Sequence, residues 1–230
     1  MSKIAFVGGK LVDGTGAAPV EDSLVLVDDK KIAYAGPRTE VPEGYEVRDI
    51  QGRTIMPGLI DTHLHFSGNL TDNDNDWVIE SVAQKQACAV KQSWDALSHG
   101  LTTVCEIGRN GIAIRDLVNM GVMEGPRIFA TGLGFCRVAG HGDCHQLPQE
   151  ISKNGHPWGD QVDGPWDLRK AVRRRLRENP DAIKIWATGG GIWRWDSDRL
   201  QLFCTEEIKA IADECALVGI PLYAHSYNNF

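Results

Sequence analysis

The sequence predicts a mixed α/β fold in two parts, and three observations support this prediction. Apolar residues make up 42% and charged residues 24% of the 230 residues, which is ordinary usage for a globular chain. Residues 1–56 consist of short extended pieces separated by glycine and proline, which predicts a small β-sandwich segment. Residues 57–230 alternate strand and helix patterns at the period of β-α units, which predicts a largely parallel sheet.

The N-terminal segment is predicted to contain only strands and turns. Lys3–Val7 alternates weakly, and Ser23–Val27 (SLVLV) is a strongly apolar run. Ile32–Ala35 follows a charged turn and is expected to pair with that run as a hairpin. Glu46–Ile50 and Thr54–Met56 add further extended pieces. Residues 1–56 are therefore expected to form one all-β segment.

The second segment, residues 57–230, is predicted to alternate five strands with four long helices. The strands are expected at Leu59–Leu64, Leu101–Glu106, Arg127–Thr131, Ala182–Ala187 and Ile220–Ala224. The helices, recognised by their apolar spacing, are expected at Val78–Ser98, Ile112–Met123, Trp166–Glu178 and Thr205–Val218. Strands and helices in this order form parallel β-α units.

Five such units leave two architectures open. A closed (β/α)8 barrel takes about 250 residues for eight units, and only about 175 residues follow the N-terminal segment. The chain is therefore either an open five-strand sheet or part of a TIM-type barrel, truncated before strands 6–8. Residues 132–164 are too many for a simple connection, so we expect a long loop over the active face.

Charge and cysteine usage exclude several classes of protein. The net charge is −7 and no basic stripe is present, which argues against nucleic acid and anionic membranes as partners. The six cysteines are scattered with no CxxC pair, as in a reduced cytosolic protein. The start of the chain lacks the pattern of a signal peptide, and no apolar run is long enough to span a membrane. We expect a cytoplasmic protein with a small-molecule substrate.

The segment Thr54–Phe66, TIMPGLIDTHLHF, carries the strongest chemical signal. His63 and His65 lie two positions apart on a predicted strand, so both imidazoles face the same side. Two neutral imidazoles form a half-site for a metal such as zinc, but the same pair could simply be polar residues at a strand end. Asp61 lies on the same face and is a candidate to orient one of these ligands.

Two further side chains lie at the carboxyl ends of predicted strands. Lys184 lies in the apolar strand AIKIWA, where its amine must be paired, be neutral or extend its charge to solvent. His225 lies in PLYAHS, and taken alone it could equally be a hydrogen-bonded core histidine. Carboxyl ends of parallel strands converge on the face where active sites form. These two side chains and the imidazole pair are therefore expected to meet there.

The motifs TIMPGLIDTHLHF, AIKIWATGGG and PLYAHS, in this order and spacing, resemble the amidohydrolase superfamily of metal-dependent hydrolases. The likeness is to the prolidase and imidazolonepropionase-like branch, and it extends over essentially the whole chain. It implies that the chain is the N-terminal portion of a barrel enzyme. It also implies two divalent metal ions, expected to be zinc.

The resemblance implies a role for each of the four side chains. His63 and His65 would hold one metal ion, and His225 would hold the second. Lys184 would be carboxylated on its amine, so that the carbamate bridges both ions. A hydroxide held by the metals would be the nucleophile toward the scissile carbonyl.

The expected activity is hydrolysis of an amide or peptide C–N bond, with a dipeptidase or an N-acyl amino acid hydrolase favoured. A cyclic amidase of the imidazolonepropionase kind, a mononuclear deaminase and a non-catalytic scaffold of the same fold stay open. Family members add a histidine after the sixth strand and an aspartate after the eighth. Neither position exists before Phe230, so the chain alone is expected to be an incomplete catalyst. A complementing C-terminal segment or a homo-oligomer is the expected partner.

Three loop residues are candidates to bind substrate. The resembling branch has a stretch like Gly140-His141-Gly142, which makes His141 a candidate to polarise the substrate carbonyl. Trp193 and Arg194 lie in WRW, where an exposed pair of tryptophans flanking an arginine could clamp an apolar substrate with a carboxylate. The alternatives are a mobile loop histidine and simple loop packing. Strand two reads TTVCE where relatives often have Arg-Asp, which leaves the role of Cys105 and Glu106 open.

Overall fold

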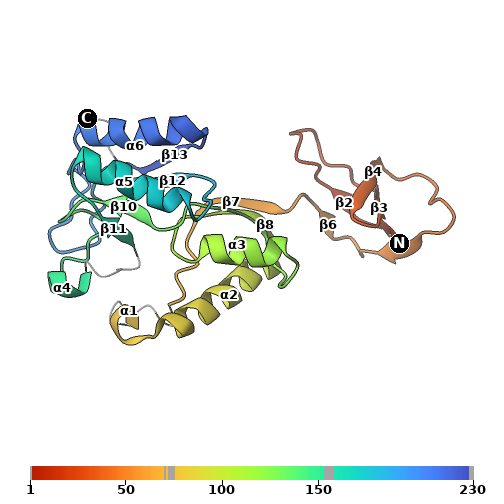
Figure 1. Cartoon of the computed structure of the whole chain (residues 1–230). Helices are drawn as coiled ribbons and strands as arrows, with labels where there is room; N and C mark the ends of the chain where they lie inside the picture. Colours follow the sequence, from red (N-terminus) through yellow and green to blue (C-terminus); the bar gives the residue numbers. More distant parts are fainter. Residues whose placement is uncertain (1, 70, 72–75, 153–157, 228–230) are drawn as a thin grey trace. The chain divides into compact units, whose positions relative to one another are not determined.

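The computed structural model describes residues 2–69, 71, 76–152 and 158–227. The chain divides into two compact units, Met1–Gly58 and Leu59–Phe230 (Figure 1). The sequence had suggested a boundary between residues 56 and 57. None of the helices in the described ranges is long and apolar enough to cross a membrane.

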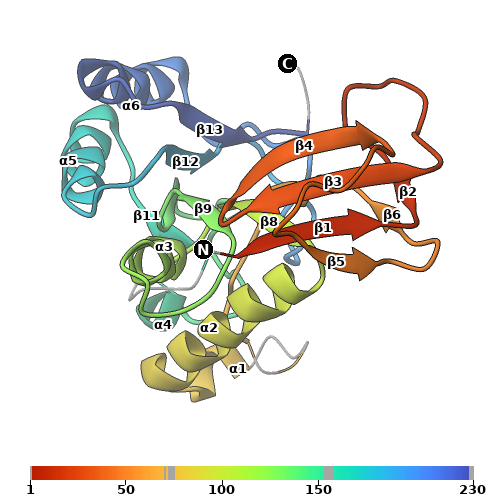
Figure 2. The ribbon, with the colours of Figure 1, turned by 90° about the vertical axis from the view of Figure 1, so that its right-hand side faces the viewer.

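The first unit contains six strands, and four of them form one sheet (Figure 2). The strands are β1 (Lys3–Val7), β2 (Lys10–Leu11), β3 (Ser23–Asp28), β4 (Lys31–Pro37), β5 (Glu46–Asp49) and β6 (Thr54–Ile55). The sheet order is β4-β3-β1-β5, with β3 and β4 forming the expected antiparallel hairpin, and β2 pairs separately with β6. Ala5, Val7, Leu24 and Leu26 form its buried core.

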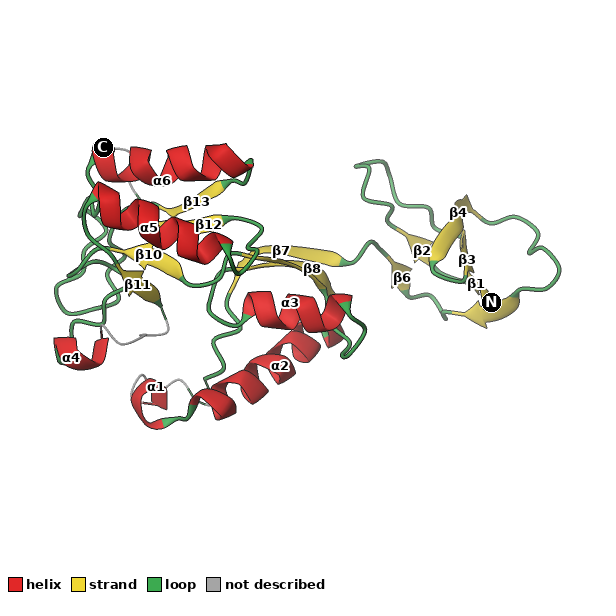
Figure 3. Ribbon diagram, viewed as in Figure 1, coloured by secondary structure: helices red, strands yellow, loops and turns green. Residues whose placement is uncertain are grey.

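The second unit alternates strands and helices (Figure 3). Its strands are β7 (Leu59–Leu64), β8 (Leu101–Glu106), β9 (Arg127–Ala130), β10 (Gly134–Cys136), β11 (Gly159–Gln161), β12 (Ile183–Trp186) and β13 (Leu222–His225). Its helices are α1 (Asp76–Ile79), α2 (Val82–Ser98), α3 (Gly111–Asn119), α4 (Gln149–Ser152), α5 (Pro165–Leu176) and α6 (Thr205–Val218). All pairings between these strands are parallel, as predicted for β-α units.

Helices cover two parallel sheets within this unit. The sheet β7-β8-β9 packs against α2 and α3 around Val104, Ile114 and Ile128. The sheet β11-β10-β12-β13 packs against α5 and α6, which lie side by side in Figures 1 and 2. Its core contains Leu168 and Ile211. Burial of these apolar faces fixes the strands whose ends carry the candidate site.

The expected helix Val78–Ser98 is instead two helices. Ser81 has an extended backbone and caps α2, because its hydroxyl accepts from the amide of Gln84 at 3.2 Å. The Gln84 side chain accepts in return from the Ser81 amide at 2.9 Å. This capping box starts a new helix in place of continuing α1.

The expected helix Ile112–Met123 also ends early, at Asn119. Gly121 has a φ of 70°, a conformation that a continuing helix cannot adopt and that glycine adopts without steric cost. The apolar helical spacing in the sequence extends to Met123, whereas the helical backbone ends at Asn119.

Residues 132–164, expected to form one long loop over the active face, do line a cavity through His141 and Trp158, but they also contain regular structure. Two short parallel strands, β10 and β11, lie in this segment, and β10 pairs with both β11 and β12. Glycines begin both strands because a Cβ at Gly134 or Gly159 would lie 2.6 or 2.9 Å from the Trp186 ring. This need for glycine hides the usual strand composition from a reading of the sequence.

The chain passes from one parallel sheet to the other between β9 and β10. Gly132, with a φ of 67°, lies at this step. Asp181, just before β12, links the sheets: its amide donates to the carbonyl of Ala130 at 2.8 Å and its carboxylate accepts from the Ala130 amide at 2.8 Å. The carboxyl ends of β7, β12 and β13 are thereby held within one unit.

Candidate functional site

Two imidazoles lie at the carboxyl end of β7. The rings of His63 and His65 are 5.2 Å apart between centroids and meet edge to face. The Nδ1 atom of His65 lies 2.6 Å from the carbonyl oxygen of Ile107. Because a carbonyl only accepts, Nδ1 carries the proton and Nε2 keeps a lone pair available to a metal. Asp61 accepts the backbone amide of His63 at 2.9 Å, so it orders the strand end and not an imidazole.

The backbone of Phe66, the residue after His65, is hydrogen-bonded by side chains from the end of β8 and the loop that follows it. The Phe66 amide donates to Glu106 Oε1 at 3.1 Å, and the Phe66 carbonyl accepts from Asn110 Nδ2 at 2.8 Å. Glu106 is fully buried, and its Oε2 finds no hydrogen-bond partner in the described ranges. Desolvation raises the pKa of Glu106 to about 8, against the lowering effect of nearby backbone amides.

Lys184 on β12 is a buried amine, only 2% exposed. Its Nζ lies 5.6 Å from the centroid of the Trp186 ring, and the described residues offer it no ion pair. Desolvation lowers the pKa of Lys184 to about 8. The amine therefore does not extend its charge to solvent, which removes that interpretation of this residue.

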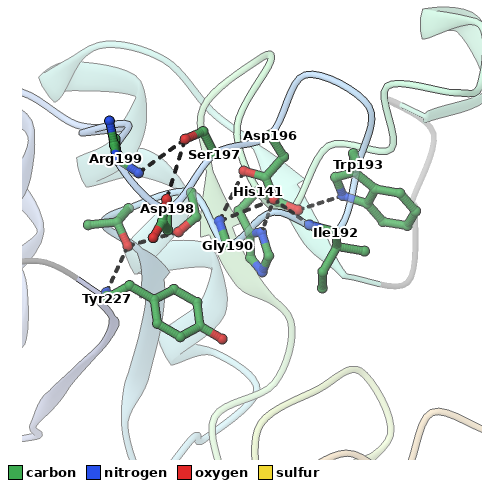
Figure 4. Close-up of polar contacts among 11 residues, drawn as sticks. His141, Gly190, Ile192, Trp193, Asp196, Ser197, Asp198, Arg199 and Tyr227 are labelled. Atoms are coloured by element: carbon green, nitrogen blue, oxygen red, sulfur yellow. Dashed lines mark hydrogen bonds and ion pairs between the residues drawn. The ribbon is translucent and has the colours of Figure 1, made fainter.

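A second pair of imidazoles comes from the segment after β10 and from the end of β13. His141 and His225 stack with centroids 4.4 Å apart and an interplanar angle of 17°. His225, at the end of β13, keeps Nε2 buried without a hydrogen-bond partner among described atoms. His141 instead directs Nδ1 to the carboxylate of Asp196 at 2.5 Å (Figure 4).

The carboxylate of Asp196 is the centre of a compact hydrogen-bond network (Figure 4). It accepts from the amides of Gly190 at 3.0 Å and Ile192 at 3.1 Å as well as from His141. Burial alone would raise the pKa of Asp196, but these hydrogen bonds outweigh it and hold the pKa below its ordinary value. Asp196 is therefore an ionised carboxylate enclosed in protein.

A cavity of about 290 Å³ brings the two imidazole pairs together. Its lining consists of histidines and apolar or aromatic side chains: His63, His65, His141, Trp158, Trp186, Ile192, Trp193, His225 and Tyr227. This composition, a few polar groups in an aromatic wall, is that of a small-molecule site.

The charge of Lys184, which is not among the residues that line this cavity, acts on three of its imidazoles. After desolvation, the charge of Lys184 is among the causes that lower the pKa of His63, of His65 to about 4, and of His225 to about 4. Neutral imidazoles are the form that binds metal. His63, His65 and His225 therefore line one cavity, and the charge of the Lys184 amine acts on all three rings.

The donor chemistry fits a divalent metal. Nε2 of His225 has no hydrogen-bond partner among described atoms, and Nε2 of His65 keeps its lone pair because Nδ1 faces a carbonyl. Lys184 forms no ion pair within the described ranges. However, across the described ranges no three His, Cys, Asp or Glu side chains form a set that could hold a metal ion. The residues thus offer partial ligand sets facing one cavity, and not a closed coordination sphere.

The structure corrects the expectation of two exposed tryptophans around Arg194. Trp193 is buried, because its indole Nε1 donates to the His141 carbonyl at 2.8 Å and its ring packs beside Cys144. Trp195 is 65% exposed, with the Arg194 guanidinium 5.1 Å from its ring centroid. Arg194 does not line the cavity, whereas Trp193 does.

Sequence reasoning missed Asp196 and left Glu106 unassigned. The His141–Asp196 contact joins residues 55 positions apart in two loops, where no periodicity applies. The available signal was an acidic residue directly after the WRW stretch and shortly after three glycines.

Comparison with known proteins agrees with the family resemblance seen in the sequence. The model of the Amidohydrolase family matches residues 54–229. An ochratoxinase from Aspergillus niger is 31% identical over 236 residues, covering 94% of this chain and 48% of the relative. A 5-methylthioadenosine/S-adenosylhomocysteine deaminase from Symbiobacterium thermophilum is 29% identical, covering 81% of this chain and 46% of the relative. The chain spans about half the length of the curated relatives it matches.

Solved structures of similar fold include a prolidase complexed with N-methylphosphonate-L-proline. It is 26% identical with a TM-score of 0.84, covering 99% of this chain and 57% of that one. A Xaa-Pro dipeptidase with bound methionine is 26% identical with a TM-score of 0.82, covering 98% of this chain and 57% of that one.

Proposed function

The chain belongs to the amidohydrolase family, and we propose that the full-length protein is a metal-dependent hydrolase that cleaves the C–N bond of an amide. The observation that carries the proposal is the single cavity shared by the two imidazole pairs, with buried Lys184 in electrostatic contact with three of the four rings.

Four residues would hold the metal. We propose two zinc ions, which His63, His65, Lys184 and His225 would hold. A bound divalent cation supplies Lewis acidity toward the scissile carbonyl. The remaining ligands would come from a part of the full-length protein outside these 230 residues, or from a partner chain that completes the barrel.

Lys184 is suited to carboxylation by its surroundings. Burial lowers the pKa of Lys184 to about 8, which makes the neutral amine more accessible near neutral pH, and a neutral amine can attack carbon dioxide. A nitrogen–carbon bond forms, one proton leaves to solvent, and a carbamate anion results. That anion would supply the negative charge that neighbouring cations need and that the described carboxylates do not supply at Lys184.

The chain's own residues would bind and orient the substrate. Trp158, Trp186 and Trp193 form an apolar wall of the cavity. His141 would meet the substrate through Nε2, because its Nδ1 is engaged by Asp196. With the proton on Nδ1, Nε2 accepts a hydrogen bond from the substrate and does not polarise its carbonyl. Arg194, exposed beside Trp195, would meet a carboxylate only at the rim of the site.

A dipeptide or an N-acylated amino acid is the proposed substrate class. The similar structures named prolidase and Xaa-Pro dipeptidase support it, as does the likeness to an ochratoxinase. The aromatic wall favours an apolar group beside the amide.

Two other activities have some support. An imidazolonepropionase from a Caulobacter strain is 50% identical, but over only 53 residues and 22% of this chain, which favours a cyclic amide substrate only weakly. A mononuclear deaminase is favoured by the longer match to the Symbiobacterium enzyme. In that case Lys184 would carry no carbamate. A non-catalytic scaffold would carry no stoichiometric metal.

The decisive experiment is metal analysis of the full-length protein together with native mass spectrometry and an amidase assay. We expect about two zinc ions per chain, a carbon dioxide adduct lost in Lys184→Met, and hydrolysis of N-acyl amino acids or dipeptides. One metal without the adduct, with ammonia released from an aminopurine nucleoside, would replace the proposal by deamination. Absence of both metal and turnover would leave a non-catalytic scaffold as the remaining interpretation.

A further inference from the structure

Asp196 occupies a position that the proposed chemistry does not yet explain. It lies in the loop after β12, and its side chain is only 1% exposed. Its carboxylate faces no arginine or lysine among the described ion pairs, and its partners are the His141 ring and the amides of Gly190 and Ile192. An enclosed carboxylate with one imidazole as its ionisable partner is costly to keep unless the contact has a use.

We propose that Asp196 is a positioning residue that holds His141 in one ring orientation and one tautomer, with Nε2 presented to the cavity as a hydrogen-bond acceptor for the substrate. The inference rests on the proposed amide hydrolysis and adds to it the residue that orients this histidine. An ionised carboxylate only accepts, so Nδ1 of His141 must be the donor and carry the proton. Nε2 is then the ring nitrogen left for the cavity that His141 lines.

Further contacts restrict the same ring. The Trp193 indole donates to the backbone carbonyl of His141, which ties the two loops at a second point (Figure 4). A Cβ at Gly190 would lie 2.3 Å from Cε1 of the His141 ring, so the backbone of the Asp196 loop touches the imidazole. His225 covers a face of the ring by stacking. Rotation of the imidazole is therefore opposed by packing, and its tautomer is set by the carboxylate.

A substitution at position 196 can separate the orientation of the His141 ring from the stability of the loop. Two backbone amides would still find an oxygen in an asparagine at position 196, whereas the charge that selects the Nδ1–H tautomer would be gone. Loss of the equivalent carboxylate in a hydrogen-bonded histidine pair, as in the serine-protease triad, lowers kcat strongly by allowing the wrong tautomer.

The test combines kinetics and nuclear magnetic resonance on the full-length, metal-loaded protein with isotope-labelled histidine. In the wild type we expect a low-field Nδ1–H proton on His141. A bare Nδ1 there would overturn the proposal without any variant. In Asp196→Asn we expect that signal to weaken or shift, kcat to fall about 10- to 100-fold, and KM to change less than about threefold.

A double-mutant cycle shows whether Asp196 acts through His141. In the background His141→Ala, Asp196→Asn should change kcat by less than about twofold, because the group that it orients is absent. An equal loss in both backgrounds would mean a structural role and contradict the proposal, as would wild-type kcat in Asp196→Asn. Asp198→Asn is the matched control: it makes the same change at an exposed carboxylate of this loop, and we expect unchanged kcat and an unchanged signal.

If the full-length protein hydrolyses no amide, the proposed function fails. The resonance experiment still decides the positioning role in that case, since it needs no turnover. The two failures are therefore distinguishable.

Discussion

His65 and His141 are largely enclosed imidazoles that line the same cavity, yet their Nδ1 atoms meet different acceptors. Nδ1 of His65 meets the backbone carbonyl of Ile107 at 2.6 Å, and Nδ1 of His141 meets the carboxylate of Asp196 at 2.5 Å. A neutral carbonyl fixes the ring orientation and leaves Nε2 as a lone-pair donor, which suits a metal ligand. A carboxylate fixes the same tautomer and adds a negative charge, which suits a ring that acts on the substrate.

The carboxyl groups of Glu106 and Asp196, near these two rings, differ in their pKa. Glu106 accepts from the amide of Phe66, the residue after His65, and forms no ion pair within the described ranges; its pKa is raised to about 8. Asp196 stands behind His141, and hydrogen bonds hold its pKa below the ordinary value. One side of the cavity is therefore supported by a carboxyl group that favours its neutral form, and the other by an ionised one. A list of the histidines in the cavity would not by itself distinguish a metal ligand from a residue that orients substrate; the neighbouring carboxyl groups make that distinction.

The largest expected effect separates the two rings by metal content. His65→Ala should weaken zinc binding more than about 100-fold, because it removes a proposed ligand. His141→Ala should retain the metal of the wild type while kcat falls about 100-fold or more. Elemental analysis after gel filtration and steady-state kinetics check both.

His99→Ala is the matched control, since His99 caps the exposed end of α2 away from the cavity. It should change neither metal content nor kcat. Equal metal loss in the two cavity variants would remove the distinction between the rings.

The second-largest effect is expected from a variant that displaces the His141 ring without changing its chemistry. Gly190→Ala places a methyl group where 2.3 Å separates the built Cβ from the ring, so the imidazole must shift. We expect kcat to fall about tenfold or more with zinc content unchanged, as measured by the same two assays. Ser197→Ala, in the same loop, should behave as the wild type. Loss of metal in Gly190→Ala would show that the two sides of the cavity are not independent.

A smaller effect concerns stability on the His65 side. Glu106 binds a proton in the folded state between its ordinary pKa of 4.5 and about 8, whereas the unfolded chain has released it. Its stabilising contribution is therefore complete below 4.5 and is lost as pH rises through 8, at up to about 1.4 kcal/mol per pH unit. Glu106→Gln should flatten this fall in the free energy of unfolding, measured by urea titration at several pH values.

Glu214→Gln is the contrasting variant for that measurement. Glu214 is buried but bound by Arg173 and Arg169, whose hydrogen bonds lower its pKa despite desolvation. Its contribution is present above the ordinary pKa and is lost as pH falls, so this variant should lose stability at neutral pH. If Glu106→Gln kept the wild-type slope, Glu106 would be ionised in the folded protein.

The smallest expected effect is at Arg194, which touches neither ring. Arg194→Ala should raise KM about two- to threefold for a substrate with a carboxylate and leave it unchanged for the matching amide-capped substrate. The comparison of KM values for this substrate pair checks it. An unchanged KM for both would remove Arg194 from the substrate site.

Local patterns predicted most of the fold. Ser23–Asp28 with its hairpin partner, β7, β8 and α6 lie within a residue or two of their expected bounds. Predictions failed where a local device overrode periodicity, as at the Ser81 cap and at Gly121. They also failed where tertiary contacts required glycine, as at Gly134 and Gly159 beside Trp186. The partial barrel and the metal roles of the four site residues stay predictions.

The sequence by itself determined the His-x-His strand, the lysine in an apolar strand and the histidine ending the next one. Each follows from the two-residue period of a strand and from the convergence of parallel strand ends. Only the tertiary structure decided that Asp196 meets His141, that Trp193 is buried and that Glu106 supports the residue after His65. These contacts join loops and strand ends far apart in the chain, and the path of a loop depends on what it packs against and not on a repeating pattern.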